Sequence, residues 1–238
     1  MSAGLVVALV ACLAVMAAVA AWVHLGPTRW QPLTGPVAAA LLLLVGRAAG
    51  LSWAQLGLGS GSVVPGLVWG GAAVACVALV YTVGLAIPAT RGLFRDARHR
   101  VGTRTVLHRA GLAVPLGTVV FEEVAFRGVL WGLLEVAHGA AWATGVSAVL
   151  FGFWHVLPAV EGARQNSPTG QVSRADLARQ VAGTVLFTTL AGVVFGALRD
   201  QSGSLLAPAL LHWATNGLGI VAAALAWRWP AQGSDAVK

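Results

Sequence analysis

Apolar stretches of about 20 residues, the length that crosses a bilayer as an α-helix, follow one another along the whole chain. They cover approximately residues 4–23, 36–53, 64–87, 115–134, 140–157, 180–198 and 204–227. The second, fifth and sixth stretches are short, and the seventh contains Pro208, so splitting one of them would make an eighth helix. The pattern predicts an all-α protein, a polytopic membrane bundle of about seven helices.

Composition supports a membrane protein, because 58% of the residues are hydrophobic and only 10% are charged. The first apolar stretch differs from a secretion signal, since the preceding MSAG has no charged residue and the apolar run is long. We therefore expect it to be retained as the first helix. Residues 1–110 are expected to form N-terminal helices and a basic loop, residues 111–229 a catalytic core, and residues 230–238 a short tail.

Basic residues lie almost entirely in alternate loops, once Arg47 and Arg127, which fall inside spans, are set aside. They are Arg29, Arg91, Arg95, Arg98, Arg100, Arg104, Arg109, Arg164, Arg174, Arg179, Arg228 and Lys238. Only Arg199 falls on the other side of the predicted bundle. Because cytoplasmic loops are enriched in Lys and Arg, the N-terminus is expected outside and the C-terminus in the cytoplasm. The net charge of +7 then indicates anionic lipid headgroups as partners, and no nucleic acid is expected.

Two of the predicted loops have a pattern of their own. In residues 89–112 basic and apolar side chains are interleaved, which predicts an amphipathic helix in the headgroup region. In residues 158–179 turn-forming residues precede Ser173, a predicted helix start with Asp176 three residues later. Several tryptophans near span ends are expected to anchor the protein at the membrane interface. They are Trp22, Trp30, Trp53, Trp131, Trp227 and Trp229.

Polar side chains interrupt three of the predicted spans. Glu122, Glu123 and Arg127 lie in VVFEEVAFRGVLWG, while single histidines lie in the next span and in the last. Ionisable groups inside a bilayer normally face a protein interior or a water-filled cavity, because exposure to lipid costs several kcal/mol. Glu123 and Arg127 are four residues apart and can form an intrahelical ion pair. Glu122 points about 100° away and is a candidate general base, although a purely structural network remains an alternative.

The other polar positions repeat the four-residue spacing. Phe151 and His155 share one helical face, as do His212 and Asn216. A lone histidine in an apolar helix is more often a packing residue, but two histidines together with a glutamate pair favour a functional site. Glycines beside these residues, such as Gly152, would allow the helices to approach closely.

The segments EEVAFR, FGFWH and HWATN resemble the ordered motifs EExxxR, FxxxH and HxxxN of the CPBP family. This family comprises CAAX proteases and bacteriocin-processing intramembrane proteases. The resemblance covers roughly residues 112–228, and it implies an intramembrane endopeptidase that hydrolyses peptide bonds. Glu122 would be the base that activates water, and His155 would orient that water. His212 and Asn216 would donate hydrogen bonds to the oxyanion of the tetrahedral intermediate.

The remaining motif residues are expected to support the site. Glu123, paired with Arg127, would stabilise the helix and the local electrostatic field. Phe151 would exclude water or lipid from the site. A mechanism without a metal is favoured, because the HExxH spacing is absent and Asn is a poor zinc ligand. Zinc stays open as an alternative, in which Glu122, His155 and His212 would be its ligands.

The expected substrate is a peptide or a membrane protein. Fourteen arginines against one lysine, with abundant Ala, Gly and Val, resemble a bacterial chain, which argues against a prenylated substrate. A non-catalytic bacteriocin-immunity or binding protein is one alternative, although no motif residue is missing. A proton-coupled transporter is another, but it would be expected to carry polar sites in both halves of the chain.

Overall fold

A computed structural model describes residues 2–25, 31–167 and 169–229, and within these ranges it contains helices and no strand. The α-helices in these ranges are α1 (Ala3–Leu25), α2 (Gln31–Ala48), α3 (Val63–Ala86), α4 (Pro88–Arg91), α5 (Thr103–His108), α6 (Val120–Glu123), α7 (Trp131–His138), α8 (Ala140–Trp154), α9 (Val156–Asn166), α10 (Arg174–Ser202), α11 (Leu206–Trp213) and α12 (Gly219–Arg228). The predicted all-α fold is confirmed.

Several of these elements join into longer helices through π-helical segments. The segments η5 (Arg109–Ala113), η6 (Pro115–Val119) and η7 (Val124–Leu130) connect α5, α6 and α7 into one helix over residues 103–138, here called the glutamate helix. The segment η8 (Ala214–Leu218) joins α11 to α12. Five helices of the described chain are long and apolar enough to span a membrane, and α2 is a shorter apolar helix. The protein is therefore a multi-pass membrane protein.

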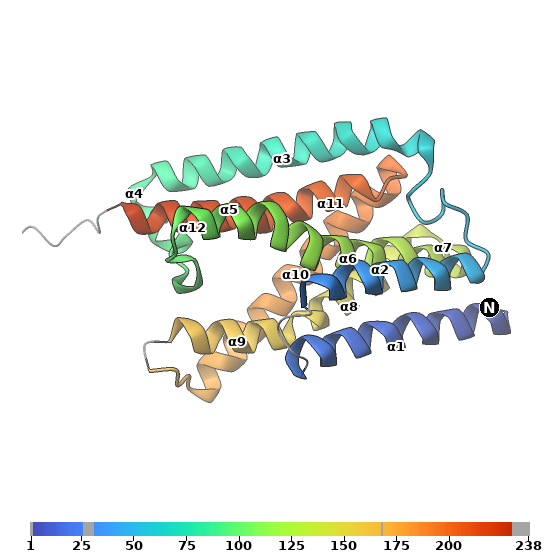
Figure 1. The fold of residues 1–238 in the computed structure, drawn as a ribbon, viewed down its shortest axis with the longest axis horizontal. Coiled ribbons are helices and arrows are strands. Elements are labelled where there is room, and N and C mark those ends of the chain that lie inside the picture. Colours follow the sequence, from blue (N-terminus) through green and yellow to red (C-terminus); the bar gives the residue numbers. More distant parts are fainter. Residues whose placement is uncertain (1, 26–30, 168, 230–238) are drawn as a thin grey trace, which may run out of the picture.

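The glutamate helix lies at the centre of the bundle, in contact with α2, α8 and α11 (Figure 1). Helix α3 runs beside α11, α1 beside α2, and α10 packs along α8. The interface between α8 and α10 is close because it is built on glycines. A Cβ atom at Gly152 would lie 2.0 Å from Thr189 Oγ1, and one at Gly192 would lie 2.8 Å from Ala148 Cα. Small residues of this kind let membrane helices approach backbone to backbone.

Some helix boundaries differ from the predicted ones. Helix α2 ends at Ala48 rather than near residue 53, because Gly50 has φ +91° and Arg47 donates a hydrogen bond to the carbonyl of Leu51. The basic segment predicted as an interfacial helix instead contains short turns followed by the first turns of the glutamate helix. The fifth span continues through α9 to Asn166, so the loop after it is short.

The helix start predicted at Ser173 is confirmed, whereas the split considered at Pro208 is not present. Ser173 is the N-cap of α10, and its Oγ accepts a hydrogen bond from the backbone N–H of Asp176 at 3.1 Å. Pro208 does not split the last span, because it lies in the first turn of α11, where a proline removes no helical hydrogen bond. The tryptophan prediction was wrong for Trp131, which is buried and donates to Thr144 Oγ1. Trp30, Arg29, Lys238 and the predicted tail lie outside the described residues.

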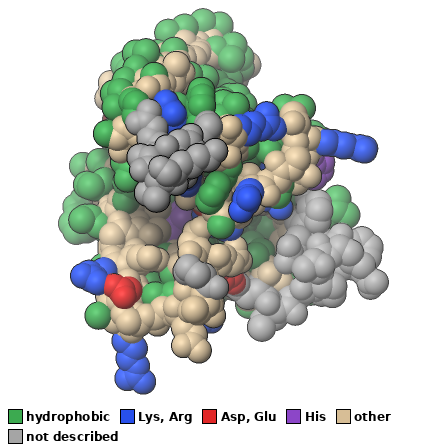
Figure 2. All heavy atoms as spheres, turned by 90° about the vertical axis from the view of Figure 1, so that its left-hand side faces the viewer, with side chains coloured by type: hydrophobic (Ala, Val, Ile, Leu, Met, Phe, Trp, Pro, Cys, Tyr) green, Lys and Arg blue, Asp and Glu red, His purple; other side chains and the backbone are tan. Residues whose placement is uncertain are grey.

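Most of the arginines gather at one end of the bundle, the basic end, where α5 and α10 begin and α3, α9 and α12 end (Figure 2). The exception noted in the sequence, Arg199, is buried near the opposite end. Its Nη2 donates to the carbonyls of Gln55 at 2.7 Å and Ala54 at 3.3 Å, and its Cζ lies 4.8 Å from the centre of the Trp131 ring. Arg199 therefore ties the connection between α2 and α3 to α10.

We expect Arg199→Met to destabilise the protein by about 1–3 kcal/mol, because the hydrogen bonds from the buried guanidinium to the carbonyls of Ala54 and Gln55 would be lost. The matched control is Arg174→Met on the same helix, where the side chain is exposed. Thermal unfolding in detergent would show a lower Tm for the first variant and an unchanged Tm for the second. Equal Tm values for both variants would mean that the Arg199 contacts do not stabilise the fold.

Candidate active site

Glu123 lies at the centre of a buried polar cluster on the glutamate helix. Its Oε1 accepts hydrogen bonds from Arg127 Nη1 at 3.1 Å and from His212 Nδ1 at 2.7 Å. The predicted ion pair between Glu123 and Arg127 is thus present, and it also receives a histidine from α11. All three side chains are buried, so the ion pair of Glu123 and Arg127 is stabilised by these contacts rather than by water.

Aromatic rings enclose the guanidinium of Arg127. Its Cζ lies 4.0 Å from the centre of the Phe151 ring and 4.6 Å from that of Phe195. A guanidinium over aromatic faces is stabilised by a cation–π interaction, which is strongest where water is excluded. Phe151 also packs against Phe126 and His155, so it fills the space between the motif residues.

Glu122 adjoins the same cluster but faces a different neighbour. Its Oε1 accepts a hydrogen bond from Trp154 Nε1 at 3.0 Å. Its Oε2 is buried, has no hydrogen-bond partner among the described residues and lies 3.8 Å from His212 Nε2. The two oxygens of this carboxylate therefore differ: one is held in place, and the other keeps its capacity to accept a proton.

His155 occupies the break between α8 and α9, where its backbone leaves helical geometry at φ −87° and ψ 2°. Its Nδ1 lies 2.8 Å from the carbonyl oxygen of Phe151. Because a carbonyl only accepts, Nδ1 must carry a hydrogen, and Nε2 of the neutral ring is then an acceptor.

His212 is more enclosed than the sequence suggested. Its ring stacks on Phe195 with centres 5.2 Å apart, and its Nδ1 is directed at Glu123. It can donate from Nε2 only when it carries both protons, and the cluster then holds two carboxylates and two cations. Asn216 lies one turn farther along, in η8, and the π geometry of this segment is of the kind frequently found at functional sites.

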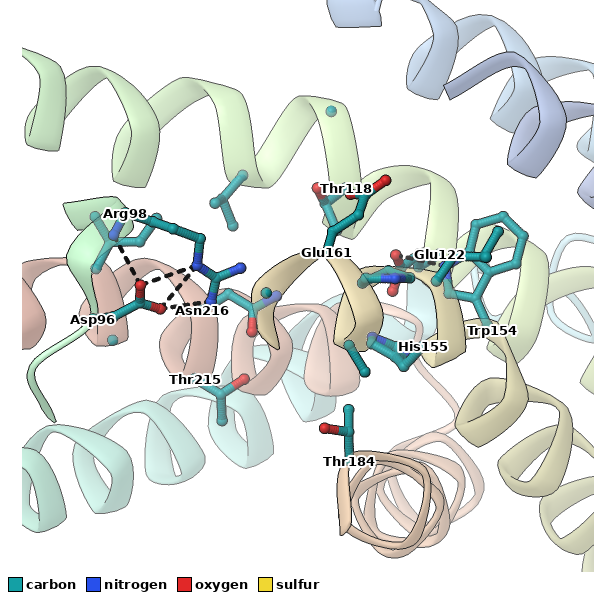
Figure 3. Close-up of a pocket in the computed structure, with 18 of the residues that line it drawn as sticks. Asp96, Arg98, Thr118, Glu122, Trp154, His155, Glu161, Thr184, Thr215 and Asn216 are labelled. Carbon is teal, nitrogen blue, oxygen red and sulfur yellow. Dashed lines mark hydrogen bonds and ion pairs between the residues drawn. The ribbon is translucent and has the colours of Figure 1, made fainter. Parts of the chain in front are cut away.

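A cavity of 970 Å³ leads from the basic end of the bundle to Glu122. Trp154 and His155 line its inner end together with Glu122, and Figure 3 shows these three side chains far from the Asp96–Arg98 pair at the other end. Thr184, Thr215 and Asn216 add polar groups to the wall, whereas α1 and α12 contribute apolar ones. His212 is absent from the lining among the described residues.

The outer end of the cavity, the mouth, carries Asp96, Arg98, His99 and Asn166. Burial alone would raise the pKa of the Asp96 carboxyl, but hydrogen bonds and charge from Arg98 outweigh it and hold the pKa below its ordinary value. Burial, together with the charges of Arg98 and Arg109, lowers the pKa of His99. At neutral pH the mouth therefore has an ionised Asp96–Arg98 pair and a neutral His99.

The polar residues of the site are also the candidate ligands for a metal ion. Within the described ranges, no group of three or more His, Cys, Asp or Glu side chains is arranged to hold a metal ion. His212 directs Nδ1 to Glu123 and His155 directs Nδ1 to the carbonyl oxygen of Phe151, so one nitrogen of each ring is already engaged. In this arrangement Glu122, His155 and His212 do not fit as a zinc site.

Two residues of the site were missed in the sequence. Trp154 immediately precedes His155, but nothing in the spacing shows that its indole reaches Glu122, 32 positions away in the chain. Phe195 comes from α10, a helix that contributes no motif. Its only sequence signal is the pair of glycines, Gly192 and Gly196, that bring α10 close to α8.

Comparison with known proteins gives one finding for this site. Residues 106–218 match the family model described as type II CAAX prenyl endopeptidase Rce1-like. No curated protein and no solved structure matches the chain. The matched segment contains Glu122, Arg127, Phe151, His155, His212 and Asn216. Through this segment, which carries all three motifs, the chain is similar to the CAAX protease family.

Proposed function

We propose that this protein hydrolyses a peptide bond inside the membrane with a water molecule activated by Glu122. The observation that supports this most is Glu122, which lines the inner end of the cavity and whose buried Oε2 has no hydrogen-bond partner among the described residues. A general base needs such an acceptor within hydrogen-bond reach of the attacking water. His155 lines the same cavity, and its Nε2 would accept a hydrogen bond from the other hydrogen of that water and so orient it.

The oxyanion requires a hydrogen-bond donor on the cavity wall. Of the two motif residues expected to be oxyanion donors, His212 and Asn216, only Asn216 lines the cavity among the described residues. Its amide N–H would stabilise the tetrahedral intermediate, a contact worth roughly 3–4 kcal/mol when preorganised. For His212, which does not line the cavity among the described residues, we propose a supporting role. It would hold Glu123 through Nδ1 and balance the charge of Glu122 through Nε2. Its sequence-based role as a direct oxyanion donor would require the ring to reach the cavity.

Trp154→Phe tests how the base is held. Phenylalanine keeps an aromatic ring beside Phe121 and Phe126, so the fold should be unchanged, but it removes the donor to Glu122 Oε1. We expect kcat to fall about 10- to 100-fold at similar KM, the cost of a hydrogen bond to a charged group. Trp142→Phe, an exposed tryptophan on the same helix, is the control. A wild-type kcat for Trp154→Phe would show that this bond does not position the base.

Cleavage of a quenched fluorescent peptide library in liposomes tests the proposed function. We expect the wild-type protein to cleave and Glu122→Ala to be inactive, and a zinc chelator to leave the wild-type rate unchanged. Loss of activity with the chelator would favour the metal alternative. Binding of peptides without any cleavage would favour the non-catalytic alternative.

We further propose that the basic end of the bundle faces the cytoplasm, with the N-terminus outside. Arginines gather at the end where α12 finishes (Figure 2). The two arginines near the opposite end, Arg47 and Arg199, both donate to backbone carbonyls and are structural. In this orientation the mouth opens toward the cytoplasm, and the substrate would be a peptide or membrane-protein segment that enters from that side.

A further inference from the structure

Three arginines and two tryptophans form a compact group at the basic end. Arg91 Cζ lies 4.7 Å from the centre of the Trp229 ring, and Arg95 and Arg100 lie 5.6 and 5.4 Å from that of Trp227. These five residues, here called the Arg–Trp patch, join the segment after α3 to the end of α12.

The patch carries positive charge that the structure does not neutralise. Between residues 91 and 109 the sequence has six arginines and a single acidic residue, Asp96. Asp96 is bound to Arg98, at 2.5 Å from Nη2. Among the described residues, no carboxylate pairs with Arg91, Arg95 or Arg100. The described residues therefore leave these three guanidinium groups able to bind an anion.

The guanidinium groups are held in place with donors to spare. Arg91 uses Nε on the carbonyl of Leu85 at 3.0 Å, and Arg95 uses Nη2 on that of Trp229 at 3.2 Å. Among the described residues, Arg91 and Arg95 each make one hydrogen bond through the guanidinium and Arg100 makes none, so further N–H groups remain for an acceptor. Such a planar fork matches the oxygens of a phosphate, and prior immobilisation lowers the entropy cost of binding.

The position of the patch indicates which phosphate it meets. Two candidate spans, Ser60–Ala86 and Leu206–Arg228, end beside it, so it lies where these helices leave the bilayer. Tryptophan is enriched at this level of a membrane, and juxtamembrane arginines attract anionic lipids. A phosphate at this depth belongs to a lipid headgroup.

The patch is also connected to the mouth of the cavity. Trp227, whose ring carries Arg95 and Arg100, donates from Nε1 to the carbonyl of Asp96 at 2.9 Å. Asp96 in turn binds Arg98, and both residues line the mouth (Figure 3). One indole therefore links the guanidinium groups to the backbone that shapes the entrance.

We propose that the Arg–Trp patch binds the phosphate of an anionic phospholipid, and that the bound lipid stabilises the observed arrangement of the mouth. A ligand stabilises the conformation to which it binds, so the lipid favours the state in which the cavity is reached from the basic end. The lipid site stands on the geometry of the patch. Its effect on catalysis rests on the proposed function as an endopeptidase.

Native mass spectrometry of the full-length protein in neutral detergent tests the site. With equal amounts of phosphatidylglycerol and phosphatidylcholine, we expect phosphatidylglycerol to be retained. The variant Arg91→Gln/Arg95→Gln/Arg100→Gln should bind it about 100-fold more weakly, because each guanidinium that contacts the phosphate directly contributes several-fold. The control Arg104→Gln/Arg164→Gln/Arg174→Gln removes the same charge from exposed arginines outside the patch and should bind normally.

Equal binding by the two triple variants, or no preference of the wild-type protein for phosphatidylglycerol, would overturn the proposal. If the patch variant does not fold, Arg100→Gln alone decides, since this side chain is exposed and its contact is the Trp227 ring. Inorganic phosphate in millimolar excess separates the two sources of a phosphate. Failure to displace the lipid is expected, and displacement would assign the patch to a soluble anion.

Kinetics in liposomes tests the connection to the mouth. We expect phosphatidylglycerol to lower KM relative to phosphatidylcholine. Trp227→Phe keeps a ring for the arginines but removes the donor to Asp96, so it should retain the lipid and lose the effect on KM. An unchanged KM in the wild-type protein would overturn the connection. Lipid binding without cleavage in any liposome would instead contradict the proposed function and leave the site intact.

Discussion

Glu122→Gln should lower the rate of peptide cleavage by about 10²–10⁴-fold, the usual contribution of a general base. Glutamine keeps the volume of the side chain and an oxygen that can accept from Trp154 Nε1, so the fold should be unchanged. What it loses is the carboxylate oxygen that could accept a proton, on a residue that lines the inner end of the cavity. The measurement is kcat in liposomes, with Tm in detergent as the check on folding.

The matched control for this substitution is Glu135→Gln. Glu135 lies on the same continuous helix, but it is not among the described residues that line the cavity. This variant should cleave at the wild-type rate. Wild-type cleavage by Glu122→Gln would exclude Glu122 as the base, and equal losses in both variants would indicate an effect on the helix rather than on the chemistry.

Arg127→Met should have the largest effect on stability. It leaves Glu123 as a buried carboxylate without its cation. It also removes the cation–π contacts of the guanidinium with the Phe151 and Phe195 rings. Removing one partner of a buried ion pair costs about 3–5 kcal/mol. We expect a clearly lower Tm in detergent together with loss of cleavage, whereas Glu122→Gln should lose cleavage alone.

The double variant Glu123→Gln/Arg127→Met separates the charge from the packing. With both charges removed, no buried ion is stranded, and the amide oxygen of the introduced glutamine can still accept from His212 Nδ1. Its Tm should therefore lie above that of Arg127→Met. A double variant as unstable as the single one would show that the guanidinium stabilises the fold through its contacts with the aromatic rings, independently of Glu123.

Local spacing explains which parts of the site could be predicted. Glu123 and Arg127 are one turn apart on a helix, so their pairing follows from sequence, and the structure confirms it. Apolar length predicted the helical membrane fold in the same way. The start of the glutamate helix was placed too late, because its first turns carry Arg104 and Arg109 and lie outside the apolar window.

Contacts between helices could not be read from spacing. The bond from Trp154 to Glu122 and the stack of Phe195 on His212 depend on how α8, α10 and α11 pack around the glutamate helix. The enclosure of His212 was missed for the same reason. The π-helical segments were missed because an i, i+4 pattern assumes regular α-helical geometry. The division of the chain at residues 110 and 229 and the catalytic roles stay predictions.

The most direct test of water activation by Glu122 is a single turnover in water labelled with the heavy oxygen isotope. With the protein in excess over a cleaved peptide, only one turnover occurs, so an oxygen donated by the protein would still be unlabelled. If Glu122 acts as a general base, the first-turnover product carries the label. An unlabelled product would show that an oxygen of the protein attacked the peptide bond, and would contradict the proposed mechanism.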